Sequence, residues 1–428
     1  MTGYRGVAPG TAARPGRAWR WAATLVAGAA AAAGCGGGEG PEPVANPRDP
    51  VRVMLRERAE ALNADDLDGW LAPVAPEARA FEEQVGRGAL AMPLARVDVT
   101  LAEADVGPGG ARFERARITL VHRYEGLPED NVFRFHVRSD VELRDGRWVV
   151  TASGPDPDAP NPPPIWATGP TDTARSPHFL ALFRPGLPGV PELLDKAERS
   201  RRRLLPRLTL EPDAAHLIVL ARDQPEYESL GGKEGSLAYA SGTYRTPSGG
   251  YLERVENREM YVNLAAVDAP GPEERDRPDG LHGVVFEHEL GHLALSRFDR
   301  AQTPLWVSEA GAMQLAEERR IDDWKRIVDG NLFESLGLSF GPMSRDESID
   351  GAEYAYANAG ASYLIEAFGI DRFWDFYQNF KALGATMTDV PAMRAEGAQR
   401  LVRRYYGFDL DELDRRTRDH MREAVAAG

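Results

Sequence analysis

The stretch from 280 to 313, GLHGVVFEHELGHLALSRFDRAQTPLWVSEAGAM, contains the residues on which the interpretation of this chain depends. Its first half is a mostly apolar run that holds His288-Glu289-Leu290-Gly291-His292. On a helix, side chains four residues apart share one face, with Cβ atoms about 5–6 Å apart. The two imidazoles can therefore meet a single Zn²⁺, for which histidine nitrogens are common ligands.

The two glutamates that accompany these histidines suit different roles. Glu289 adjoins the first histidine and can reach a metal-activated water without ligating the metal, so it is the predicted general base. Glu309 stands seventeen residues after His292, in a second helical pattern that begins near Thr303-Pro304. Two His and one Glu leave a fourth coordination position open, as in a catalytic zinc site. Leu295 and Phe298 replace the Gly and His that a metzincin needs, which excludes that class.

HELGH followed by PLWVSEAGA resembles the gluzincin metallopeptidases, in particular bacterial proteins of the peptidase-MA-like type. The resemblance covers residues 175 to about 425. It implies a zinc-dependent peptidase with one Zn²⁺ per chain, the ligands being His288, His292 and Glu309. The sequence departs from the family at Ala310, where Gly is usual. It also departs at Met313, where many relatives carry a polar side chain that supports a ligand histidine.

Gluzincins also use a Tyr or His to hold the substrate oxyanion. Relatives carry a tyrosine nine residues before a YLIE-x-[YF]-G segment, which corresponds here to residues 363–369. The resemblance therefore implies Tyr354 as the oxyanion-stabilising residue, with Tyr356 as the second candidate and His282 as the third. The helical pattern that carries both tyrosines ends at Gly369, a typical helix-terminating residue.

The expected partner of this site is a peptide or protein substrate. The strand-like segment 260–267 precedes the HExxH helix, and in gluzincins the corresponding edge strand binds an extended substrate by strand addition. The GxMEN element of gluzincin aminopeptidases is not visible, which favours endopeptidase action. The competing interpretation is a non-catalytic surface binding or scaffold lipoprotein that retains a relic zinc site.

The expected fold class is α+β throughout. In residues 51–153, the odd positions of FRFHVRSDVELR (133–144) are mostly apolar and the even positions mostly charged, which predicts a half-buried strand. Asp145-Gly146 predicts a hairpin turn into the next strand. This region resembles the nuclear-transport-factor-2-like fold, which implies a cone of curved antiparallel sheet plus helices. Residues 154–174 are proline-rich and predict a stiff linker to a metallopeptidase domain (175–428), with a small mixed sheet and a mostly helical C-terminal part.

The N-terminus predicts export. Residues 1–20 contain four arginines and no acidic residue, and an apolar run of fourteen residues ends at Gly34, as in a signal peptide over residues 1–34. Ala-Ala-Gly followed by Cys35 resembles a bacterial lipobox, which implies lipidation of Cys35 and a flexible tether over 35–50. We therefore expect an extracytoplasmic protein anchored to the cell membrane through this lipid, or otherwise a secreted one.

Composition narrows the function classes further. The chain of 428 residues has a formal net charge of −15, which argues against nucleic acid as a partner because phosphate backbones require a basic face. Cys35 is the only cysteine, so a disulfide within one chain and a zinc site built from several thiolates are both excluded. The sequence leaves the oligomeric state and the cleavage specificity open.

Overall fold

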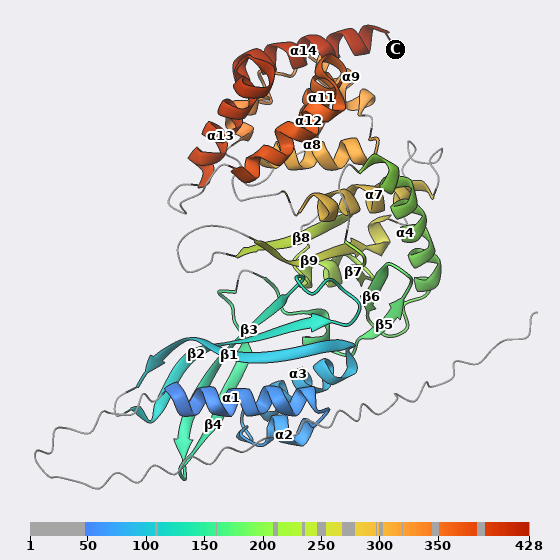
Figure 1. Ribbon diagram of the computed structural model, residues 1–428. Helices are drawn as coiled ribbons and strands as arrows, with labels where there is room; N and C mark the ends of the chain where they lie inside the picture. Colours follow the sequence, from blue (N-terminus) through green and yellow to red (C-terminus); the bar gives the residue numbers. More distant parts are fainter. Residues whose placement is uncertain are drawn as a thin grey trace, which may run out of the picture. The chain divides into compact units, whose positions relative to one another are not determined.

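The sheet of the N-terminal part (residues 48–155) has four antiparallel strands in the order β1-β2-β3-β4, and helix α1 lies across it (Figure 1). Its helices are α1 (Arg48–Asn63), α2 (Leu67–Leu71) and α3 (Arg79–Ala91). Its strands are β1 (Leu94–Val106), β2 (Arg112–Tyr124), β3 (Phe133–Arg144) and β4 (Arg147–Pro155). The predicted α+β class is confirmed here.

The computed structural model describes residues 48–107, 110–159, 161–208, 213–232, 236–245, 254–267, 279–296, 298, 303–318, 320–344, 351–382 and 390–427. The predicted signal peptide, the lipidation site Cys35 and most of the predicted tether lie outside these ranges. The described residues belong to one compact unit, Pro47–Gly428. None of the described helices is both long and apolar enough to cross a membrane.

Strand β3 confirms the predicted alternation. Its odd positions from Phe133 to Val141 are buried, and the even positions between them are half-buried. Asp145 and Gly146 form the turn into β4 with φ angles of 48° and 77°. Two successive residues with positive φ match the right-handed twist of the paired strands, which is why Asp-Gly suits this position.

The proline-rich segment is held against the N-terminal part at two places. The Asp156 carboxylate accepts hydrogen bonds of 2.5 Å from Arg117 and 2.7 Å from Arg138. Farther along, the short 3-10 helix η2 (Ile165–Ala167) is buried, and the Trp166 indole N–H donates to the Tyr124 hydroxyl at 3.0 Å. The segment is therefore held to the N-terminal part at these two places, and the predicted domain boundary within it stays a prediction.

The second sheet is mixed, with the strand order β5-β6-β7-β9-β8. β6 pairs in parallel with β7, and β7 in parallel with β9, while the pairs β5–β6 and β8–β9 are antiparallel. The strands are β5 (Asp172–Arg175), β6 (Phe179–Phe183), β7 (His216–Ala221), β8 (Ala238–Arg245) and β9 (Arg254–Asn263). The predicted small mixed sheet is confirmed.

Both faces of this sheet are buried. Ile218 and Leu220 of β7 belong to the core formed with the C-terminal helices, whereas Leu217 and Val219 belong to the core shared with the N-terminal part. A strand buried on both faces reads as a continuous apolar run, and LIVL at 217–220 is such a run. The sheet therefore joins the two halves of the chain through one layer of strands.

Helices dominate the chain after β9. Between the strands of the second sheet lie α4 (Val190–Leu204), η3 (Leu205–Arg207) and α5 (Gln224–Ser229). After them come α6 (Leu264–Val267), α7 (Gly280–Leu295), α8 (Leu305–Leu315), α9 (Ile321–Asp329), α10 (Phe340–Met343), α11 (Gly351–Phe368), α12 (Ile370–Gln378), η4 (Asn379–Ala382), α13 (Val390–Tyr406) and α14 (Leu410–Ala427). The helical C-terminal part is as predicted.

Candidate metal centre

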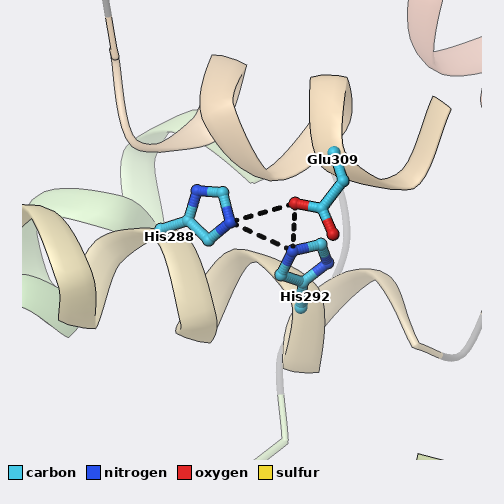
Figure 2. A group of neighbouring side chains, drawn as sticks. All are labelled: His288, His292 and Glu309. Carbon is cyan, nitrogen blue, oxygen red and sulfur yellow. Dashed lines mark hydrogen bonds and ion pairs between the residues drawn. The ribbon is translucent and has the colours of Figure 1, made fainter. Parts of the chain in front are cut away.

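Helices α7 and α8 bring three side chains together, as Figure 2 shows: His288 and His292 from α7 and Glu309 from α8. The two Nε2 atoms are 3.2 Å apart. One carboxylate oxygen of Glu309 lies 3.2 Å from the first Nε2 and 3.1 Å from the second. The three predicted ligands thus form a nearly equilateral triangle of donor atoms.

The close packing of the two helices produces this triangle. Gly291 lies inside the HExxH motif, and a Cβ atom at this position would stand 3.2 Å from the Cα of Ala312. A side chain there would push α8 outward and carry Glu309 away from the histidines. The glycine between the two ligand histidines therefore permits the short distances to the third ligand.

The triangle has the dimensions of a zinc site. With bonds of about 2.0–2.1 Å, adjacent ligand atoms of a tetrahedral zinc are about 3.3 Å apart. The observed separations of 3.1–3.2 Å are close to this edge length. Three converging ligands leave the fourth corner for water or substrate, so the residues fit a catalytic Zn²⁺.

A carboxylate behind the first histidine determines which nitrogen faces the triangle. Glu318 lies 2.6 Å from Nδ1 of His288, and a carboxylate can only accept, so Nδ1–H donates to it. Nε2 is then the nitrogen that faces the carboxylate oxygen of Glu309, and it is the one available to a metal ion.

The turn that presents Glu318 is held from several sides. Its backbone N–H bonds to the Met313 carbonyl at 2.9 Å, and the preceding residue, Glu317, has a φ of 51°. The side-chain amide of Asn358 donates to its carbonyl at 3.2 Å. Arg207 donates to the carbonyl of Leu315 at 2.9 Å, at the end of α8. The Glu318 carboxylate is therefore held in a defined place.

Charge at the centre favours a cation. Burial lowers the pKa of His288, but the neighbouring carboxylates of Glu318 and Glu309 outweigh burial and raise it well above its ordinary value. Burial raises the pKa of Glu309, but the two histidines outweigh it and hold the pKa well below its usual range. The carboxylates of Glu309 and Glu318 thus stay ionised beside the histidines and favour positive charge at the centre of the group.

Glu289 stands apart from the triangle. Among the described residues, the group whose ligand atoms lie within 4.8 Å of one another consists of the two histidines and Glu309. The helix that carries Glu289, α7, packs against β8. Burial is the largest influence on the pKa of Glu289 and raises it. A buried carboxylate of raised pKa beside a metal site suits a general base.

The structure separates the three candidates for oxyanion stabilisation. Burial raises the pKa of Tyr354, and the nearby charges of the Glu309 and Glu289 carboxylates raise it further. Tyr356 instead donates to the Asp414 side chain at 3.1 Å, inside the helical core. His282 lies at the start of α7, where its Nδ1 is 3.2 Å from the Lys196 ammonium. Of the three candidates, Tyr354 is the one whose pKa is raised by the carboxylates of the predicted metal site.

Sequence reasoning missed Glu318. It looked for a supporting side chain four residues after Glu309, where Met313 is fully buried in the core. The support comes from nine residues after Glu309, beyond the end of α8, where the chain turns back. The sequence offers only a weak signal for this: Glu317 and Glu318 directly follow the last apolar residues of the helix.

The expected substrate strand was assigned wrongly. Residues 260–267 divide between the end of β9 and the short helix α6, and β9 pairs on both sides, with β7 and with β8. A strand with two partners has no edge for a peptide. Among the described residues, β8 is the edge strand on this side of the sheet, and it packs against α7, the helix that carries Glu289.

The chain shows only limited similarity to known proteins. No family model matches the chain, and no curated protein matches it. One solved structure is a variant of an M1 zinc metallopeptidase from Deinococcus radiodurans bound to a Tyr-Ser-Ala substrate. It is 16% identical with a TM-score of 0.34, and the match covers 76% of this chain and 63% of that one.

Two further structures complete the comparison. The M1 zinc metallopeptidase of the same organism is 17% identical, with a TM-score of 0.32 and coverages of 76% and 62%. A putative scytalone dehydratase from Novosphingobium aromaticivorans is 12% identical, with a TM-score of 0.21, over 25% of this chain and 80% of that one. This chain therefore spans less than two thirds of the length of the two metallopeptidases.

Proposed function

We propose that this chain is a zinc-dependent peptidase that hydrolyses peptide bonds with Glu289 as the general base and one Zn²⁺ per chain. The observation that carries the proposal is the triangle of donor atoms at 3.1–3.2 Å from His288, His292 and Glu309. A separate buried carboxylate lies beside this triangle, on the same helix. Zinc ligation alone would not need that second carboxylate.

The chain's own residues supply the proton transfers. When bound, Zn²⁺ supplies Lewis-acid polarisation of the substrate carbonyl and lowers the pKa of water. Glu289 accepts a proton from the attacking water and passes it to the leaving amine, and its raised pKa brings it closer to the working pH. The Tyr354 hydroxyl donates a hydrogen bond to the oxygen on which negative charge develops.

The outer edge of β8 is the proposed binding site for the substrate. The Leu237 carbonyl accepts a hydrogen bond from the N–H of Asn263 of β9. Hydrogen-bonded and non-hydrogen-bonded pairs alternate along an antiparallel ladder. The backbone groups at odd positions of β8 therefore bond to β9, and those at the even positions, Ala238 and Ala240, face outward. These outward groups lie on the strand that packs against α7, the helix of Glu289. An extended peptide can pair with this edge beside the base.

Strand addition reads the peptide main chain more than its side chains. An internal segment of a protein presents its main chain as well as a terminus does. This recognition supports endopeptidase action, which forms part of the proposal.

Zinc content and activity of two variants test the function. Wild type and Glu289→Gln are expected to hold about one zinc per chain, whereas Glu309→Ala is expected to lose it. Peptide hydrolysis by Glu289→Gln is expected to fall by about 10²–10⁴-fold. Equal behaviour of wild type and Glu289→Gln on all peptides would instead support a non-catalytic binding lipoprotein with a relic zinc site.

We further propose that the peptidase works outside the cytoplasm, anchored to the cell membrane by a lipid on Cys35. The support comes from the sequence alone, namely the arginine-rich start, the apolar run and the single cysteine at its end. Cys35→Ser is expected to release the protein into the medium or leave it unprocessed. Unchanged membrane retention of this variant would contradict the anchor.

A further inference from the structure

Strand β9 contains a bulge that faces the N-terminal part. Ser241 of β8 pairs with Glu259, but Thr243 pairs with Glu256, so β9 has one extra residue between these pairs. Asn257 lies in this bulge with a φ of 54°. A bulge turns a strand locally and frees backbone groups from the ladder for other partners.

The freed groups pair with residues 131–134 of the N-terminal part. The N–H of Asn257 donates to the Val132 carbonyl at 3.0 Å, and its side-chain oxygen accepts from the N–H of Arg134 at 2.9 Å. The Asn131 amide makes the matching pair with Arg258: it accepts from the N–H at 2.8 Å and donates to the carbonyl at 2.8 Å. Two asparagines thus link the two segments reciprocally.

Charged pairs surround these amide bonds. The Arg258 side chain is 3% exposed and donates to Asp213 at 3.0 Å and to Asp130 at 2.9 Å. Arg134 donates to the buried carboxylate of Glu256 at 2.7 Å. Bonds between buried charged groups are stronger than neutral ones and are costly to break. The clamp, defined as Asn131, Arg134, Asn257 and Arg258, is therefore a rigid attachment.

The clamp lies close to the part of β8 that we propose binds the substrate. It contacts β9 at residues that lie opposite positions 241–243 of β8. Ala240 is the next residue along β8. Strand β8 packs against α7, the helix that carries Glu289. Movement of β8 and β9 would therefore change the packing around the base and the position of the proposed peptide-binding edge.

We propose that Asn131 and Asn257 are positioning residues through which the N-terminal part holds the β8–β9 hairpin in register with Glu289. The inference rests on the proposed function for its kinetic consequence but not for its structural one. The N-terminal part then acts as a fixed support of the peptidase site. A separate ligand-binding module on a spacer would have no need of this attachment.

The test compares Asn131→Ala with Asn131→Asp in the full chain. Alanine removes both amide bonds to Arg258, whereas aspartate keeps the acceptor for its N–H. Amide hydrogen exchange in 236–241 is expected to rise by roughly tenfold or more in Asn131→Ala and less in Asn131→Asp. Exchange in α7 and the content of one zinc per chain are expected to stay unchanged.

Asn257→Gly is a second variant, because glycine adopts the positive φ of the bulge while losing the side-chain bond to Arg134. Asn379→Ala is the matched control, since that asparagine donates to Asp375 on the surface. We expect kcat/KM to fall by roughly 10- to 100-fold in Asn131→Ala and Asn257→Gly, mainly through kcat, and to stay constant in the control.

The two proposals fail in different ways. Faster exchange at β8 in a chain without peptidase activity would support the clamp and contradict the proposed function. Unchanged exchange at 236–241 in both Asn131→Ala and Asn257→Gly would overturn the clamp, whatever the activity. Equal loss of kcat in Asn131→Ala and Asn131→Asp without faster exchange at β8 would also overturn it.

Discussion

The Glu318 carboxylate accepts a hydrogen bond of 2.6 Å from Nδ1 of His288, which fixes the ring with Nε2 directed at Glu309. The two residues are thirty positions apart in the chain. A ligand histidine held in this way is pre-oriented before any metal arrives, and its basicity is raised by the carboxylate. Glu318 therefore belongs to the metal centre although it would touch no metal.

Replacing Glu318 by Gln is expected to weaken zinc affinity by about 10- to 100-fold, because the amide no longer orients the histidine by a charged hydrogen bond. Competition with a chromogenic chelator measures this affinity. Glu317→Gln is the matched control, since that side chain is 65% exposed and pairs with Arg207. Equal affinities of wild type and Glu318→Gln would contradict the assigned role.

Tyr354→Phe and Tyr356→Phe are expected to separate catalysis from stability. Loss of the Tyr354 hydroxyl should lower kcat by about 10²–10³-fold with little change in folding, as for other oxyanion donors. Loss of the Tyr356 hydroxyl breaks its bonds to Asp414 and should cost about 1–3 kcal/mol of unfolding free energy without lowering kcat. Steady-state kinetics and urea unfolding of both variants check this, and the reverse pattern would overturn it.

The Asp156 carboxylate predicts an acid-sensitive contribution to stability. Burial raises its pKa, but hydrogen bonds from Arg138 and Arg117 outweigh burial and lower it from an ordinary value of 3.8 to about 2. Because the folded-state pKa is depressed, the contribution is complete above about pH 4 and is lost as the pH falls toward 2.

Asp156→Asn should therefore cost about 2 kcal/mol at pH 7, with a smaller difference from wild type at pH 2–3. Urea unfolding across this pH range measures the difference. Asp158→Asn is the control, because that carboxylate is 60% exposed and pairs with Arg138 from outside. A difference independent of pH would show that the Asp156 charge is not responsible.

Gly360→Ala is expected to destabilise the helical core by about 1–3 kcal/mol. A Cβ atom at this position of α11 would overlap the Phe340 ring, which is fully buried beside Trp306 and Tyr356. Gly351→Ala, in the first turn of the same helix, meets no atom within 4 Å and should be nearly neutral. Thermal unfolding of the two variants gives the comparison, and similar melting temperatures would contradict the packing argument.

The sequence alone determined the features that depend on local geometry. Helical periodicity places His288 and His292 four residues apart on one face, and this relation holds wherever the helix lies. The alternation from Phe133 to Arg144 and the Asp145-Gly146 turn likewise follow from the geometry of one hairpin. The α+β class and the mostly helical C-terminal part could be predicted for the same reason.

Only the tertiary structure decided which distant residues meet at the site. Glu309 reaches the histidines because α7 and α8 pack closely at Gly291, and Glu318 returns to His288 through a turn beyond α8. The position of β8 at one edge of the sheet, and the attachment of β9 through Asn257, depend on strand order. Strand order and helix packing arise from burial of whole apolar faces, which spacing along the chain does not specify.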